Sequence, residues 1–163
     1  MLSTAYGLDC PSMVRYPRGG GTGKVPPQNL DTIPVGKGEI RRQGSAIALL
    51  AFGSLVPAAM AAGDELDATV VNMRFVKPLD VELIVEMAGN HSLLVSIEEN
   101  SVIGGAGSEV ERVLAERGIQ VSLLRLGLPD RFIDHGEQGQ LLAELGLDKD
   151  GIVRAVRERA AKP

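Results

Sequence analysis

The run VSIEENSVIGGAG, from Val95 to Gly107, places two adjacent carboxylates and a glycine-rich turn directly after an apolar segment. The apolar residues before Glu98 suit a buried strand, and the glycines at 104, 105 and 107 permit a tight turn into a helix. A strand that leads through such a turn into a helix is typical of α/β proteins, whose functional groups gather at the carboxyl ends of strands. This segment therefore predicts an α/β architecture before it predicts any reaction.

Strands alternate with helices along most of the chain. Residues 46–52 form a continuous apolar run typical of a central parallel strand, and residues 33–41 suit a short edge strand or hairpin arm. Ser54 is expected to cap the helix that follows, with Pro57 in the first turn of that helix. Asp80 is expected to cap the next helix along the chain. Further strands are expected over 68–75, 92–97 and 119–126, and helices over 81–88, 109–116, 138–145 and 151–160. The pattern predicts a mainly parallel sheet with helices on both faces.

The first 27 residues are organised differently. Residues 1–8 have the character of the end of a helix, and residues 12–16 that of a short strand with no earlier partner, so we expect the chain to begin within a domain. Residues 17–27 hold four glycines and three prolines in eleven positions, which is too irregular for a helix or a strand. They are expected to form a linker or an active-site loop before the main domain.

The amino-acid composition limits which binding partners and which cellular compartment we expect for this protein. Seventeen basic and twenty-one acidic residues give a net charge of −4, and with 3% aromatic residues and no Trp they disfavour nucleic-acid binding. No apolar run approaches the roughly 20 residues that a membrane span needs, and the start lacks the basic flank of a secretion signal. The single cysteine, Cys10, excludes an intramolecular disulfide and fits a reducing compartment. We therefore expect a cytoplasmic protein with no nucleic-acid or membrane partner.

The carboxylates and the glycine turn each have two interpretations. Alternation along a strand points Glu98 and Glu99 to opposite faces, so we expect a solvent-facing or subunit-facing role in place of a paired acid and base. The turn at 104–107 could cradle an anion at a helix N-terminus. Close packing of turn against helix is the favoured interpretation, because the full dinucleotide-binding spacing is missing.

Other side chains offer little catalytic chemistry. His91 and His135 lack the further histidine or cysteine that a zinc site requires. Ser54 lacks a Gly-x-Ser-x-Gly context, so no nucleophile is expected. Arg74 could pair with Asp80 or Glu99 between strand ends.

Basic residues flank and enter the glycine-rich loop. Arg15, Arg18 and Lys24 lie in or beside it, and a guanidinium on such a loop can clasp a phosphate with two hydrogen bonds. The alternative is that these exposed side chains only keep the loop soluble.

Five motifs occur in a characteristic order. They are VRYPRG at 14–19, VGKG at 35–38, MRFVKPLD at 73–80, EEN followed by GGAGS at 98–108, and GLPD at 127–130. Together they resemble the C-terminal portion of the 1-deoxy-D-xylulose-5-phosphate synthase family, and residues 132–148 fit the same family. The resemblance covers essentially the whole chain.

The resemblance implies a fold and a reaction for the complete protein. Members are homodimeric transketolase-like transferases that use thiamine diphosphate and magnesium to condense pyruvate with glyceraldehyde 3-phosphate, releasing carbon dioxide. Their product feeds isoprenoid, thiamine and pyridoxal synthesis. By resemblance, residues 1–25 are the tail of the preceding pyrimidine-binding domain with its linker, and residues 26–163 are a transketolase-like C-terminal domain.

One residue role carries over from the family. Arg18 matches the arginine that contacts the substrate phosphate, although Gly20 stands where relatives often have Asn. No Gly-Asp-Gly with a following Asn is present for cofactor and metal, and the glutamate that activates the pyrimidine lies in sequence outside this chain. We therefore expect no catalytic, cofactor-binding or metal-binding residue here, and a chain that is inactive alone, binds neither thiamine diphosphate nor magnesium, and serves as scaffold and dimer surface.

Two alternatives stay open. The chain could be the C-terminal region of a transketolase or of a 2-oxoacid dehydrogenase β-subunit, which share the fold, although the motifs at 73–80 and 127–130 favour the synthase. It could also be a free-standing anion-binding regulatory module that uses the turn at 104–107.

Overall fold

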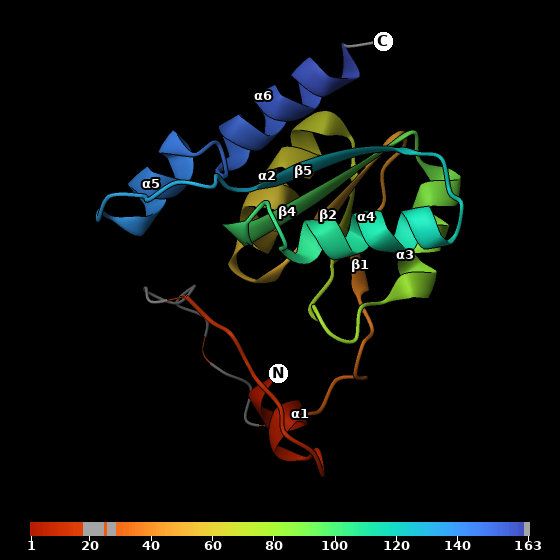
Figure 1. The fold of residues 1–163 in the computed structure, drawn as a ribbon, viewed down its shortest axis with the longest axis vertical. Coiled ribbons are helices and arrows are strands. Elements are labelled where there is room, and N and C mark those ends of the chain that lie inside the picture. Colours follow the sequence, from red (N-terminus) through yellow and green to blue (C-terminus); the bar gives the residue numbers. More distant parts are fainter. Residues whose placement is uncertain (18–24, 26–28, 162–163) are drawn as a thin grey trace.

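The computed structural model describes residues 1–17, 25 and 29–161, and its centre is a five-stranded sheet. The strand order is β1-β3-β2-β4-β5, and β2 to β5 are parallel, whereas β1 pairs antiparallel with β3 at one edge (Figure 1). The strands are β1 (Glu39–Arg42), β2 (Ile47–Ala51), β3 (Thr69–Asn72), β4 (Leu93–Ser101) and β5 (Ser122–Leu128). The predicted mainly parallel sheet is confirmed.

Helices cover both faces of this sheet, as the alternation of strands and helices predicts. Figure 1 shows α2 and α6 on one face and α3 and α4 on the other. The helical elements are α1 (Leu2–Tyr6), the 3-10 turn η1 (Gly53–Leu55), α2 (Val56–Leu66), α3 (Val81–Asn90), α4 (Ala106–Glu116), α5 (Gln138–Glu144) and α6 (Lys149–Ala160). Among the described residues, no helix has the length and apolar character that a membrane span requires.

The central strand β2 explains why the sheet needs both layers. Leu49 and Ala51 pack toward α2 and α6, whereas Ala48 and Leu50 pack toward α3 and α4. Leu49 and Leu50 are both fully buried, and burying one leucine side chain is worth about 1.5–3 kcal/mol. A strand that is apolar on both sides is therefore stable only between two layers of helices.

Several element boundaries differ from those expected from sequence. β3 ends at Asn72 and not near 75, because Arg74 adopts a positive φ of 60° that strand geometry excludes. No strand forms over residues 12–16, where the described chain supplies no partner strand. The expected helix in residues 1–8 is present as α1, and its Thr4 Oγ1 accepts a hydrogen bond of 2.9 Å from Ile33 N–H.

The two expected helix caps have different outcomes. Ser54 does not cap α2; it lies in η1, and its hydroxyl donates to Glu99 Oε2 at 2.5 Å. The 3-10 turn separates Ser54 from the first turn of α2, while Pro57 does lie in that first turn. Asp80 caps α3 as expected, accepting from Leu83 N–H at 3.3 Å.

Asp80 also ties α3 to the loop before β1. Its carboxylate accepts from Gly38 N–H at 2.9 Å and from Lys37 Nζ at 3.1 Å. Burial alone would raise the pKa of Asp80, but the hydrogen bonds from Gly38, Lys37 and Leu83 outweigh burial and hold the pKa below its ordinary value. The charged carboxylate is therefore the form that the fold stabilises.

Replacing Asp80 should lower stability in a pH-dependent way. Asp80→Ala removes the cap and leaves Gly38 N–H without its acceptor, so the free energy of unfolding at pH 7 should fall by about 1–2 kcal/mol. Because the folded pKa is depressed, the contribution is present above about pH 4 and is lost as the pH falls through the folded value. Urea unfolding at pH 7 and pH 3 should therefore show a difference between wild type and variant that shrinks in acid. Glu86→Ala on the exposed side of α3 is the control, and an equal loss there would contradict the assignment.

Candidate functional site

The loops that leave β2, β3, β4 and β5 lie at one edge of the sheet, because these strands are parallel. This carboxyl edge is where open α/β sheets bind their ligands. Polar groups gather there around the end of β4, where the ladder with β5 shifts register between Ile97 and Ser101. The candidate site is therefore built around Glu98 and Glu99.

Glu98 occupies the N-terminus of α4. Glu98 is 4% exposed, and its two carboxylate oxygens accept from Ala106 N–H at 2.7 Å and Gly107 N–H at 2.8 Å. A carboxylate is favourable there because free N–H groups and the helix dipole both attract negative charge. The expectation of a solvent-facing or subunit-facing Glu98 is wrong, because β4 points this side chain into the layer that holds α4.

Two glycines of the turn allow the end of β4 to pack closely against the start of α4. A Cβ at Gly105 would overlap the Glu98 carboxylate, and a Cβ at Gly107 would overlap Ser96 Oγ. Close packing of turn against helix, the favoured interpretation of this motif, is confirmed. The N–H groups of Ala106 and Gly107, which an external anion would need, are already used by the chain's own carboxylate.

Glu99 points to the opposite face, as strand alternation predicts. It accepts from Ser54 Oγ at 2.5 Å and from Gln138 Nε2 at 3.0 and 3.3 Å. Its backbone carbonyl accepts from Arg15 Nη2 at 3.2 Å. Gln138 was not expected in the site, and no sequence signal marks it, since it lies 39 residues away on α5.

The other basic candidates lie apart or outside the described residues. Arg74 forms an ion pair with Glu39 of β1, so its expected pairing with Asp80 or Glu99 is wrong. The positive φ at Arg74 places its side chain beside the edge strand instead. Arg18 and Lys24 fall outside the described residues.

The two histidines, His91 and His135, lie in different environments. His91 Nδ1 lies 2.8 Å from the Met87 carbonyl and Nε2 lies 2.8 Å from Thr69 Oγ1, so this ring links α3 to β3. His135 is exposed in the loop before α5. Within the described parts of the chain, no three His, Cys, Asp or Glu residues are grouped so that they could hold a metal ion.

Apolar side chains are exposed along the same carboxyl edge. Val76, Ile103 and Phe132 follow β3, β4 and β5 and are 55%, 67% and 104% exposed. Among the described residues beyond 35, the large apolar side chains that are exposed all lie on these three loops. Each of the three loops thus presents one large apolar side chain to solvent.

Comparison with known protein families identifies the family of this chain. The family described as transketolase, C-terminal domain, matches residues 36–152. The chain belongs to this family. The transketolase C-terminal domain thus accounts for the five-stranded sheet and for both helix layers.

Individual relatives confirm the resemblance drawn from the motifs. The chain is 81% identical over 159 residues to a 1-deoxy-D-xylulose-5-phosphate synthase of Dechloromonas aromatica, and 58% identical over 159 residues to one of Nitrosomonas eutropha. Each match covers 98% of this chain but 26% of the relative. The chain thus corresponds to a C-terminal portion of these synthases and spans about a quarter of their length.

Solved structures agree on the fold. A split gene transketolase, solved as an inactive beta4 tetramer, aligns with a TM-score of 0.71 at 34% identity over 79% of this chain and 43% of its own. A transketolase from Leishmania mexicana aligns with a TM-score of 0.55 at 20% identity over 76% of this chain and 18% of its own, which supports the fold alone.

Removing the Glu98 carboxylate should destabilise the domain more than removing that of Glu99. Glu98→Ala leaves two buried N–H groups without acceptors, so the free energy of unfolding should fall by about 2–4 kcal/mol. Glu99→Ala, at a partly exposed position, should cost about 1 kcal/mol or less. Urea unfolding of both variants measures the difference, and equal losses would show that the helix N-terminus does not depend on Glu98.

Proposed function

We propose that this chain is the C-terminal portion of a thiamine-diphosphate-dependent synthase that condenses pyruvate with glyceraldehyde 3-phosphate to 1-deoxy-D-xylulose 5-phosphate. The observation that carries the proposal is 81% identity to such a synthase over nearly the whole chain. The similarity to a solved transketolase is weaker, at 34% identity, so a transketolase is the less supported alternative. The complete protein would be a cytoplasmic transferase that supplies isoprenoid, thiamine and pyridoxal precursors.

The domain division follows from the same proposal. Residues 1–25 would be the tail of the preceding pyrimidine-binding domain with its linker, and residues 26–163 the C-terminal domain. The exposed Val76, Ile103 and Phe132 support a scaffold role, because they offer the remainder of the synthase, or the second copy in a homodimer, an apolar surface to bury.

Among the described residues, the groups at the carboxyl edge do not fit thiamine diphosphate or magnesium, because they already have partners within the chain. A diphosphate would need free N–H groups at a helix N-terminus, yet those of Ala106 and Gly107 bind the Glu98 carboxylate. A second carboxylate, that of Glu99, is taken by Ser54 and Gln138. We therefore derive no chemical step through either group and propose that both bind elsewhere in the full-length enzyme. The same occupied N–H groups argue against a free-standing anion-binding module.

Arg18 is the residue that we propose contacts substrate. It lies in the motif VRYPRG, one of the five that resemble the synthase family. Its guanidinium would bind the phosphate of glyceraldehyde 3-phosphate through charge-assisted hydrogen bonds. Such a contact orients the aldehyde for attack but supplies no proton and no nucleophile. Its loss should therefore weaken substrate binding more than it slows turnover.

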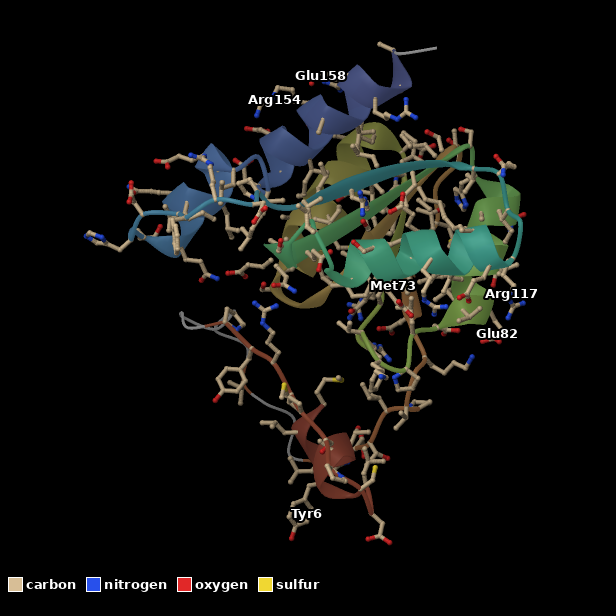
Figure 2. The ribbon with its side chains drawn as sticks, in the orientation of Figure 1. Tyr6, Met73, Glu82, Arg117, Arg154 and Glu158 are labelled. Carbon is tan, nitrogen blue, oxygen red and sulfur yellow. The ribbon has the colours of Figure 1, made fainter. Side chains whose placement is uncertain are left out.

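In the full-length enzyme, Arg18→Ala should raise the KM for glyceraldehyde 3-phosphate about ten- to a hundredfold, the equivalent of about 1.5–3 kcal/mol. The KM for pyruvate should stay unchanged, since pyruvate carries no phosphate. Steady-state kinetics with each substrate varied in turn measures both. Arg117→Ala is the control, because Figure 2 shows Arg117 at the end of α4 away from the carboxyl edge. Unchanged kinetics in Arg18→Ala would refute the role.

The chain alone should not consume pyruvate. Purified 163-residue chain, supplied with thiamine diphosphate, magnesium and both substrates, should give no product above the rate without protein. The reason is that the groups which hold the cofactor belong to the remainder of the synthase. Full-length enzyme assayed beside it is the positive control, and turnover by the chain alone would overturn the scaffold role.

A further inference from the structure

The edge of the sheet formed by β1 has several features that oppose pairing with a further strand. β1 is four residues long, and three residues of its sequence EIRR are charged. It pairs antiparallel with β3, and the register shifts between Ile40 and Arg42. A short strand, an irregular register and charged side chains all prevent another strand from adding to an edge. The β1 edge is therefore suited to remain exposed to solvent.

The opposite edge, formed by β5, lacks these features (Figure 1). β5 is seven residues long, its sequence SLLRLGL has four leucines and one charge, and all seven residues are half-buried. It pairs with β4 in an unbroken register from Ser122 to Leu126. A long, regular and apolar edge strand is the kind that proteins cover with another chain segment.

The outer side of β5 presents backbone groups that only another strand matches along their whole length. Strand residues direct their N–H and C=O groups to one side or the other in alternation, so about half of those in β5 point away from β4. The backbone of β5 bonds to β4 and to Val102 just after β4, and no described backbone group bonds to its outer side. Addition of an extended strand would satisfy this row of donors and acceptors.

A second copy of β5 complements this edge in shape. Two identical edges can pair antiparallel around a twofold axis, and an axis through Arg125 overlaps all seven residues. This pairing sets Leu124 opposite Leu126 of the second copy. Both leucines pack on the α2 and α6 layer and are only partly buried, so each would cover apolar surface of the other.

The charges at the centre of β5 complement each other across the same axis. Arg125 Nη1 lies 2.9 Å from Glu111 Oε2 of α4, and the two side chains are 33% and 58% exposed. Because Glu111 balances the charge of Arg125, two copies of Arg125 can approach one another. Around the axis, each Arg125 would also lie beside Glu111 of the second copy, so that opposite charges alternate.

We propose that the outer edge of β5 binds the β5 strand of a second copy, which joins two five-stranded sheets into one continuous sheet. This inference rests on the homodimer of the proposed function and names the contact that the C-terminal domain makes in it. The partner is recognised by backbone hydrogen bonds along the strand, by paired leucines on one face and by the Arg125 and Glu111 charges on the other.

Cysteine cross-linking of the full-length enzyme tests the pairing. Arg125→Cys would place two cysteines on the twofold axis with Cα atoms about 4.5–5.5 Å apart, within the range of a disulfide. Under mild oxidation this variant should give a linked dimer on a non-reducing gel, which a reductant separates. Arg41→Cys on β1, where the arginine side chain is 50% exposed, is the matched control. It should give no more linked dimer than wild type, which retains the exposed Cys10.

A second design covers the case in which Arg125→Cys does not fold. The same axis sets Ser122 opposite Leu128 of the second copy, whereas within one copy these residues lie about 20 Å apart along the strand. The double variant Ser122→Cys with Leu128→Cys should therefore link the two copies, and Ser122→Cys alone should not.

Sedimentation of the full-length enzyme distinguishes failure of this inference from failure of the proposed homodimer. A dimer that neither cysteine design links would overturn the β5 contact and leave the proposed function. Slow amide hydrogen exchange along β5 in such a dimer would assign the edge to another segment of the enzyme. Equal linking of Arg41→Cys and Arg125→Cys would likewise overturn the contact, because it would reflect random collision. A monomeric full-length enzyme would overturn the homodimer and this inference together.

Discussion

The Glu98 carboxylate at the N-terminus of α4 is the interaction on which the carboxyl edge depends. It is a buried negative charge whose two oxygens accept from Ala106 and Gly107 N–H. A buried carboxylate is tolerated only with such partners, and a buried helix N-terminus only with an acceptor. Each therefore stabilises the other, and together they close the turn between β4 and α4. Gly105 lacks the Cβ that would overlap this carboxylate and the Ser101 carbonyl, so a glycine is required there.

The glycine-rich turn at 104–107 has the sequence character of a cofactor-binding turn, but the Glu98 carboxylate gives it another role. A glycine-rich turn at a helix N-terminus binds phosphate in many α/β proteins. In this chain the Glu98 carboxylate occupies the N–H groups of the turn, so the turn has a structural role. The strand, turn and helix alone therefore do not indicate a bound phosphate, and a functional assignment has to come from the side chains at the turn.

Glu98 and Glu99 connect the carboxyl end of β4 to different parts of the fold. Glu98 joins β4 to the helix layer of α3 and α4, while Glu99 joins it to η1 and α5 and offers its carbonyl to Arg15. Alternation along a strand makes this division possible, because adjacent residues face opposite layers. The end of β4 thereby connects both layers to the segment that leads to the preceding domain in the proposed full-length enzyme.

The sequence by itself determined the α/β class, the parallel central strands, the Asp80 cap and the family resemblance, and it favoured close packing of the glycine turn over anion binding. All of these depend on periodicity, local spacing or short motifs, which a chain displays without folding. Only the tertiary structure decided that Glu98 is buried, that Ser54 and Gln138 meet Glu99, that Arg74 pairs with Glu39, and that Arg15 reaches the end of β4. These contacts join residues 8 to 84 positions apart, and their formation depends on strand order and loop geometry, which no local pattern encodes.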